Sequence, residues 1–429
     1  MQSEKNLERY TYDFKPMIQI VILNSLGFFF LEFILQYFAS QQLNATGTQI
    51  GLIFSVLVIG NLTSSFFTGI LTDRIKSKTK LILLGSFGRG LSYFIIYIAI
   101  IFFSLIGLGI GTFTLGFFAG IFWIPFDTLI AEKSNKNHRS HAYGKRDSAV
   151  GKGLLIGAII GFTIFSWGFL STNNSFITYC PILIFGIANF FAGIQFVRKV
   201  DESIKFSDNS TISNKSTTEE ISTAVLSKPL LIGSIFLLIV LLLSKVNGSL
   251  AKPFLNIYLL EAIESDPTIV VLAYLPSGII SMFLAPKLGE VVDKIHPVIG
   301  ITIASVIGSI ITWFLINTTN IWIFAILLIF DTTIVGTASL VLMNLLSRIT
   351  VKHRGKTMGF QLFFVSLGGI IGPIIGGITW DILGIKWPFI ISIFVELCLI
   401  PFYWIAVYLI KPHLAETYDF KLEMETQTI

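Results

Sequence analysis

Twelve apolar stretches constrain this chain more than any other feature of its sequence. A helix needs about 20 apolar residues to cross the hydrocarbon core of a bilayer, and most of the stretches reach that length. They lie at residues 17–38, 48–70, 81–103, 106–131, 149–171, 176–197, 229–260, 267–287, 298–316, 321–346, 358–381 and 388–410. The sequence therefore predicts an all-α membrane protein with twelve transmembrane helices.

Basic residues gather in alternate gaps between these stretches. The second, fourth, sixth and tenth gaps hold clusters of Lys and Arg, whereas the odd-numbered gaps hold only Lys386. Cytoplasmic loops are enriched in Lys and Arg, so the even-numbered loops are predicted to be cytoplasmic. An even number of helices then puts both termini in the cytoplasm, and we expect a multi-pass protein of the cell membrane.

Composition narrows the partners and cofactors. With 53% hydrophobic and only 13% charged residues, the chain has too few polar residues for the surface of a soluble protein. Its net charge of +5 reflects the basic residues that orient it in the membrane, so no nucleic-acid partner is expected. We expect no nucleotide, other cofactor or enzymatic activity, because no glycine-rich phosphate loop is present. A disulfide framework or metal site is not expected from two cysteines in apolar stretches and five unclustered histidines: Cys180, Cys398, His138, His141, His296, His353 and His413.

The chain repeats itself at about half its length. One fixed offset aligns the glycines at 153, 157 and 161 with those at 368, 372 and 376, and a slightly larger offset aligns Gly69 and Asp73 with Gly289 and Asp293. Two six-helix bundles related as parallel repeats follow. The four-residue glycine spacing puts each set on one helix face, which predicts close helix packing.

The repeat predicts the domain boundaries. The N-terminal six-helix bundle covers residues 1–197 and the C-terminal bundle covers residues 229–411. The polar stretch at residues 198–228 is predicted to be a cytoplasmic linker, and residues 412–429 a cytoplasmic tail.

The loop after the second stretch carries a family resemblance. It reads GILTDRIKSK from Gly69 to Lys78, which resembles the signature loop of the major facilitator superfamily, and a degenerate copy lies at residues 289–294. With twelve spans the resemblance covers essentially the whole chain, and residues 125–144 look like the helix-four exit of exporter members. Lys76 replaces the usual glycine and Ser77 stands where a basic residue is common.

The resemblance implies a cytoplasmic gate. We expect the Asp73 carboxylate to lie against the positive end of a helix from the other half as a latch, and Asp127 to pair with Arg74 or Lys78. The alternative is that these carboxylates are simply solvated at helix ends. The predicted gate residues are Gly69, Asp73, Arg74, Lys78, Asp127, Gly289, Asp293 and Lys294.

Charges inside the membrane are costly and point to function. In the superfamily helices one, four, seven and ten line the central cavity, so the resemblance implies cavity roles for Glu32, Lys245, Lys252 and Asp331. Arg89 lies about 14 Å from the cytoplasmic end of helix three and is expected to be structural, reaching that surface with its long stem. We expect Glu396, on a peripheral helix, to be packed against an internal partner.

The repeat pairs two of these charges. Its offset places Glu32 opposite Lys252 and Gln36 opposite Asn256 on facing helices one and seven, which predicts an ion pair beside a kink at Pro253. The alternative is that each side chain faces the interior of its own half. The predicted cavity or substrate-binding residues are Glu32, Gln36, Lys245, Lys252 and Asn256.

Asp331 is the first candidate for proton coupling, with Glu32 the second. Asp331 lies about ten residues into helix ten, hence near mid-bilayer, where a neutral acid costs less than an anion. Thr332 and Thr333 are expected to donate hydrogen bonds to the ionised form, which leaves a static structural role as the alternative.

Two function classes remain. The acids on cavity helices, together with a latch in both halves, favour a secondary transporter over a non-transporting receptor, scaffold or lipid-handling protein. We expect a monomer that binds a small-molecule substrate and protons in the bilayer. Proton-coupled efflux of an amphipathic or hydrophobic compound by alternating access is the first choice, and proton- or cation-coupled uptake of a polar solute is the alternative.

Overall fold

The protein folds into helices arranged in two compact units. The computed structural model describes residues 9–74, 77–135, 139–172, 174–206, 228–292, 295–349 and 354–410. The chain divides into Met1–Ile221 and Ser222–Ile429.

The first unit holds the helices α2 (Phe14–Ser25), α3 (Phe28–Tyr37), α4 (Gly47–Arg74), α5 (Lys78–Ile101), α6 (Leu105–Glu132), α7 (Arg139–Trp167), α8 (Ser175–Thr178) and α9 (Cys180–Lys199). Short π-helical turns extend α3 over Phe38–Gln42 and α7 over Gly168–Thr172. The second unit holds α10 (Lys228–Leu250), α11 (Leu255–Ala262), α12 (Pro267–Val292), α13 (Pro297–Leu315), α14 (Ile321–Ile349), α15 (Arg354–Leu383) and α16 (Trp387–Ile410).

Helices suit this sequence because a backbone in lipid must satisfy its own hydrogen bonds. Over the described residues, eleven helical segments are long and apolar enough to cross a membrane, and the apolar run Pro267–Ile280 lies within α12. With α2 and α3 counted as one crossing and α10 and α11 as another, each unit has six. The predicted all-α membrane fold with two six-helix bundles is confirmed.

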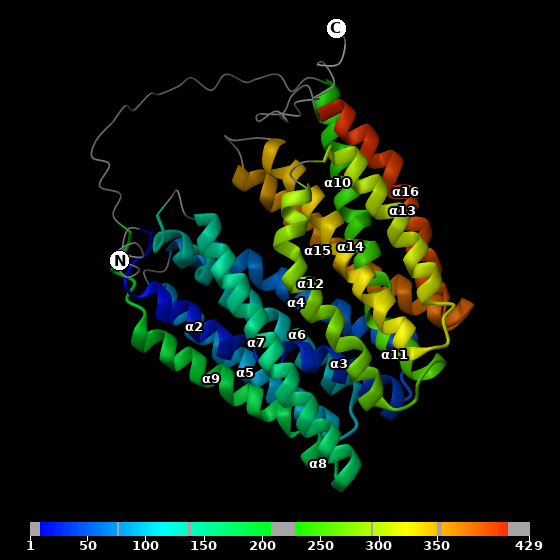
Figure 1. Ribbon diagram of the computed structural model, residues 1–429. Helices are drawn as coiled ribbons and strands as arrows, with labels where there is room; N and C mark the ends of the chain where they lie inside the picture. Colours follow the sequence, from blue (N-terminus) through cyan, green and yellow to red (C-terminus); the bar gives the residue numbers. More distant parts are fainter. Residues whose placement is uncertain are drawn as a thin grey trace. The chain divides into compact units, whose positions relative to one another are not determined.

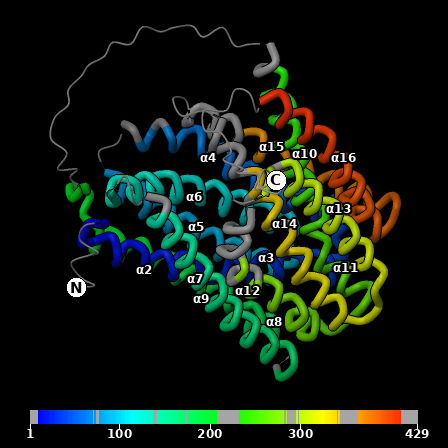
Figure 2. The backbone as a smooth tube through the Cα atoms, turned by 45° about the horizontal axis from the view of Figure 1, so that its top comes forward, coloured from blue at the N-terminus to red at the C-terminus, as the bar shows by residue number. Residues whose placement is uncertain are grey.

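The two bundles pack their helices in the same order. In the first unit α2 packs on α7 and α9, α4 and α5 pack on α6, and α5 packs on α9 (Figure 1). In the second unit α10 packs on α15 and α16, α12 and α13 pack on α14, and α13 packs on α16 (Figure 2). Every pair in the first set has its counterpart in the second, as parallel repeats require.

The aligned glycines lie where two helices approach closely in each bundle. A Cβ atom on Gly153 would lie 2.5 Å from the carbonyl oxygen of Ile22, and one on Gly368 would lie 2.6 Å from that of Leu242. Ile22 and Leu242 are separated by the same offset as the two copies of the signature loop. The predicted packing role of these glycines is confirmed.

Both bundles break their first helix. Gly27 separates α2 from α3 with a φ of +84°, a left-handed conformation that glycine adopts without steric cost, and Phe185 packs so closely that a Cβ would collide with it. This break was not predicted from the sequence. In the second bundle a 3-10 turn over Lys252–Phe254 separates α10 from α11, which confirms the kink expected at Pro253.

One helix begins earlier than expected. The fifth apolar stretch starts at residue 149, but α7 starts at Arg139, so ten mostly polar and charged residues form its first turns. A hydropathy criterion misses this extension, because these residues satisfy their backbone hydrogen bonds as a helix without being apolar.

Candidate functional site

The second unit holds a pocket of about 270 Å³ between α10, α12, α13, α14 and α16. Two carboxylic acids line it, Asp331 from α14 and Glu396 from α16, together with Lys252 from the turn after α10. Asp331 and Lys252 were predicted from the sequence to line a cavity. The pocket therefore brings one predicted acid and one predicted base together with an acid that was expected only to be packed.

Asp331 has one side-chain hydrogen-bond partner among the described residues. Its Oδ1 lies 3.3 Å from Oγ1 of Thr312 on α13, and the same hydroxyl lies 2.9 Å from the carbonyl oxygen of Gly308. The expectation that Thr332 and Thr333 donate to Asp331 is wrong. Both hydroxyls donate to carbonyl oxygens one turn earlier in α14, Thr332 to Leu328 and Thr333 to Ile329, as β-hydroxyl residues often do within helices.

Glu396 is held by neutral donors. Its Oε2 accepts a hydrogen bond from the amide of Asn247 on α10, and its Oε1 accepts one of 2.9 Å from the hydroxyl of Ser305 on α13. The carbonyl oxygen of the Asn247 side chain accepts in turn from Ser392 at 2.7 Å, which fixes the orientation of the amide. The partner that the sequence left unidentified is thus a network of three polar side chains.

The remaining predicted cavity residues lie on the first and seventh crossings. Lys245 belongs to α10, and its Cβ faces Gly368 of α15. Asn256 is 2% exposed in α11, and Gln36 is 1% exposed in α3, which also carries Glu32. Glu32 and Lys252 belong to different units, so their ion pair stays a prediction.

Two predicted gate residues of the first bundle form ion pairs that the sequence did not indicate. Lys78 Nζ lies 2.5 Å from Oε1 of Glu132, at the end of α6. Asp127 Oδ1 lies 2.5 Å from the guanidinium of Arg146 on α7, which also contacts Asp147 at 2.8 Å. The predicted pairing of Asp127 with Lys78 is therefore wrong for this structure. Sequence spacing alone did not show that the extended start of α7 brings Arg146 beside α6.

The other gate residues are only partly described. Gly69 lies in α4 and Gly289 in α12. Asp73 and Arg74 belong to the last turn of α4, and their side chains lie outside the described residues, as do Asp293 and Lys294 entirely. The latch stays a prediction.

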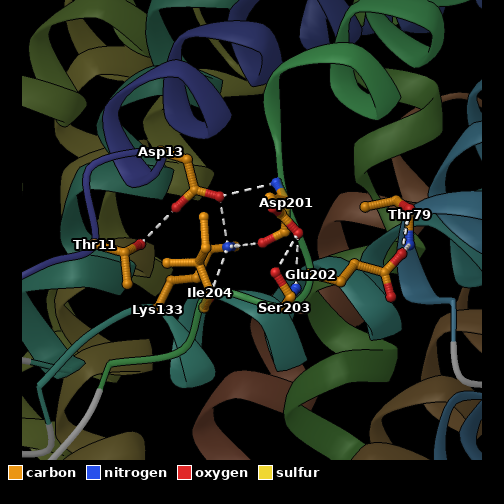
Figure 3. A network of polar contacts seen from close by, with 8 residues as sticks. All are labelled: Thr11, Asp13, Thr79, Lys133, Asp201, Glu202, Ser203 and Ile204. Carbon is orange, nitrogen blue, oxygen red and sulfur yellow. Dashed lines mark hydrogen bonds and ion pairs between the residues drawn. The ribbon is translucent and has the colours of Figure 1, made fainter.

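A buried ion pair lies at the end of the first bundle that the sequence predicts to be cytoplasmic. Lys133 Nζ lies 2.6 Å from Oδ2 of Asp13, and each side chain is 1% exposed. The ammonium also donates to the carbonyl oxygens of Asp201 at 2.7 Å and Ile204 at 3.0 Å. Figure 3 shows how the ammonium joins the start of α2, the end of α6 and the chain after α9.

Glu202 continues this network at the start of α5. Its carboxylate accepts hydrogen bonds from the backbone N–H groups of Lys78 at 2.8 Å and Thr79 at 2.7 Å, and from the hydroxyls of Ser77 and Thr79. Partial burial raises the pKa of the Glu202 carboxyl, but these hydrogen bonds outweigh it and lower the pKa below its ordinary value. A carboxylate at a helix N-terminus also interacts favourably with the helix dipole.

Sequence reasoning missed the network because its residues look like ordinary loop charges. Lys133 counted only toward the positive-inside pattern, and Asp201 and Glu202 counted as linker. His141 is an exposed residue of α7, and its ring nitrogen contacts the hydroxyl of Tyr10. The available sequence signal was the run of polar residues directly after the apolar stretch at 176–197, where the chain packs against the bundle.

Arg89 does not reach the cytoplasmic surface, so that expectation is wrong. Its side chain is 3% exposed, and its guanidinium binds the side-chain oxygen of Asn24 and, at 3.0 Å, the backbone carbonyl oxygen of the same residue. The guanidinium lies 5.4 Å from the ring centre of Phe122 and 6.0 Å from that of Trp123. A neutral amide, a helix end and two aromatic faces thus surround the cation.

Comparison with known proteins identifies the fold. A family model described as Major Facilitator Superfamily matches residues 18–350 and 311–419. No curated protein matches the chain. A bacterial homologue of the human lysosomal transporter Spinster, solved in an inward-facing and unoccupied conformation, is similar at a TM-score of 0.76 and 13% identity, with 94% of this chain and 98% of that chain covered.

Two further solved structures share the architecture. The nucleoside transporter NupG matches at a TM-score of 0.65 and 14% identity, covering 91% of this chain and 98% of that one. A structure titled as giving insights into substrate recognition in proton dependent oligopeptide transporters matches at 0.65 and 13%, covering 92% and 97%. Identities this low show the fold alone.

Proposed function

The chain belongs to the major facilitator superfamily and is a secondary transporter, and we propose that it exports an amphipathic or hydrophobic compound in exchange for protons. The observation that carries the proposal is the pocket in which Asp331, Glu396 and Lys252 line one space. Carboxylic acids inside a membrane are costly unless they are paired, face water or titrate during the reaction.

The contact of Asp331 with Thr312 suits both protonation states. The Thr312 hydroxyl has one proton, and its shorter contact is to the carbonyl oxygen of Gly308. While it donates there, its oxygen can accept a hydrogen bond from the neutral acid of Asp331. When it turns toward Asp331, it donates to the carboxylate instead. The pocket thus offers a partner to each form, as a group that loads and releases a proton requires.

Glu396 is less suited to this role. Both of its carboxyl oxygens already accept hydrogen bonds, one from Asn247 and one from Ser305, so the network holds this side chain in place. Lys252 supplies a cation on the wall of the same pocket, and it can compensate the Asp331 anion when the proton leaves. We propose Asp331 as the coupling residue, with Glu32 as the second candidate, in a cycle of alternating access between the two halves.

The rest of the pocket wall favours a substrate with an apolar body. Its larger side chains are mostly hydrophobic: Leu255, Leu315, Leu328, Ile334, Val335, Phe389 and Ile393. Sites of this kind bind apolar surface and use a few polar groups for orientation. The same proposal includes a monomer in the cell membrane, with both termini in the cytoplasm and with the cytoplasmic gate.

Uptake of a polar solute by symport is the second candidate. The amide of Asn247, the ammonium of Lys252 and two acids within one pocket favour it, since they offer both donors and acceptors to a polar solute. The same proton site would then drive import.

A gradient experiment separates the two. The purified full chain is reconstituted into liposomes, and fluorescent dyes, sugars and organic anions are tested under inward and outward acid gradients, with protein-free liposomes as the control. Exchange predicts that the compound accumulates in the more acidic compartment, because protons leave that compartment as the compound enters it. Symport predicts accumulation on the opposite side. Transport that ignores the gradient would contradict proton coupling.

A further inference from the structure

The first unit contains its own pocket, which the coupling site does not use. It has a volume of about 320 Å³ and lies between α2, α3, α4, α5, α6 and α7. Most of its lining is apolar, including Phe28, Leu57, Leu115, Trp123 and Leu154. Three polar side chains also line it, namely Ser25, Asn61 and Arg89. This size is within the range of pockets that hold small organic ligands.

Arg89 brings an incompletely satisfied cation to this pocket. A guanidinium has five N–H donors, and the hydrogen bonds to Asn24 use two of its nitrogen atoms. The third nitrogen, Nε, is buried without a hydrogen-bond partner among the described residues. Within that part of the chain no carboxylate forms an ion pair with Arg89.

Ser25 adds a second buried group on the same pocket. It is 3% exposed, and its hydroxyl has no hydrogen-bond partner among the described residues. Buried polar groups in proteins nearly always have a partner, and among the described residues Arg89 and Ser25 line one cavity while each carries a buried atom without one.

A structural role for Arg89 explains only part of this arrangement. Asn24 is held by a hydrogen bond of 3.1 Å to Ser86, and it presents its side-chain and backbone oxygens to the guanidinium at the end of α2. A helix end carries only about half an elementary charge. The faces of Phe122 and Trp123 stabilise the remaining positive charge but do not neutralise it. Arg89 therefore retains a net attraction for an anion.

We propose that this pocket binds an amphipathic organic anion. Its acidic group is bound by the guanidinium of Arg89 and the hydroxyl of Ser25, and its apolar body lies against Phe28, Leu115 and Trp123. If this anion is the transported substrate, the inference rests on the proposed transport function. Binding to the pocket does not rest on the transport function, because binding needs no proton gradient and does not involve Asp331.

Three ligands with one ring system and different charges test the proposal. They are 2-naphthoate, 2-naphthalenemethanol and 2-naphthalenemethylamine, titrated calorimetrically into the full chain in a neutral detergent, with inorganic phosphate as a fourth ligand. We expect 2-naphthoate to bind with a Kd at least tenfold lower than either uncharged or cationic analogue. Phosphate, which lacks the apolar body, should bind at least tenfold more weakly than 2-naphthoate.

Two variants and one control locate the site. Arg89→Gln should weaken 2-naphthoate binding at least tenfold, and Ala119→Leu, which fills the pocket while keeping Arg89, should do the same. Arg198→Gln, at an exposed arginine of α9, should leave binding unchanged. If Arg89→Gln does not fold, Ala119→Leu decides.

Equal binding of the three naphthalene ligands, or unchanged 2-naphthoate binding in Ala119→Leu, would overturn the proposal. Phosphate binding as tight as that of 2-naphthoate would overturn the assignment to amphipathic anions. Because these titrations use no gradient, a failure here is distinguishable from a failure of proton-coupled transport.

Discussion

The buried pair of Lys133 and Asp13 allows a quantitative prediction about stability. Asp13→Asn removes the carboxylate charge from the Lys133 ammonium, which is 1% exposed and then has only neutral oxygens around it among the described residues. Removing one partner of a buried pair costs about 3–5 kcal/mol, since the other charge stays in a poorly solvated site. The ratio of folded to unfolded protein should fall about a hundredfold or more.

The reverse change should cost a similar amount. Lys133→Met leaves the Asp13 carboxylate with the hydroxyl of Thr11 at 2.7 Å and the backbone N–H of Asp201 at 3.0 Å. The double variant removes both charges, so it should cost no more than either single change. The two residues should therefore show a coupling energy of about 3 kcal/mol.

Unfolding of the purified chain in mixed micelles with increasing dodecyl sulfate, followed by circular dichroism, measures these differences. Lys205→Met is the matched control, because Lys205 is 61% exposed and lies 3.4 Å from Glu132 in the same region. It should cost less than about 1 kcal/mol. The reasoning is refuted if Lys133→Met costs no more than Lys205→Met, or if the Asp13 and Lys133 changes are additive.

Three further predictions concern the same network, the gate and the facing charges. Glu202→Gln should destabilise the chain by about 1–2 kcal/mol at neutral pH. Because hydrogen bonds lower the pKa of the Glu202 carboxyl, the difference in stability from wild type should vanish as the pH falls through that lowered pKa. The same unfolding assay over a pH series measures this, and a difference that stays constant with pH would contradict it. Asp73→Asn should fold normally but shift the resting population toward the cytoplasm-open state, and unchanged labelling of engineered cytoplasmic-cavity cysteines would count against the latch. Neutralising Glu32 or Lys252 alone should reduce transport more than neutralising both, whereas additive losses would show that the two side chains do not meet.

The fold was largely predictable because the bilayer restricts it. Apolar length, the distribution of basic residues and the repeat were enough for the helices and for the equivalence of the bundles, and the spacing of Gly153 and Gly368 marked real helix contacts. The break at Gly27 was not predictable, since many glycines in membrane helices do not break them. The close packing of Phe185 against Gly27 is a tertiary contact, which the sequence does not show.

The site was less predictable because its contacts cross between helices. Asp331 was identifiable as a charge in an apolar stretch, but its partner Thr312 belongs to another helix, and the neighbouring threonines were the wrong donors. Lys78 and Asp127 were correctly seen as charges near one end of the bundle. Their partners, Glu132 and Arg146, depend on the rotation of α6 and α7, which sequence periodicity does not fix.

Substrate-dependent proton movement shows whether a proton on Asp331 drives transport. A pH-sensitive dye is enclosed in liposomes that contain the full chain, and a compound identified in the gradient screen is added outside. Wild type should show a substrate-dependent pH change. Asp331→Asn should lose this change while it retains downhill exchange of the compound, and Asp331→Glu should recover it in part. A wild-type pH change in Asp331→Asn would show that Asp331 does not carry the proton and would direct attention to Glu32.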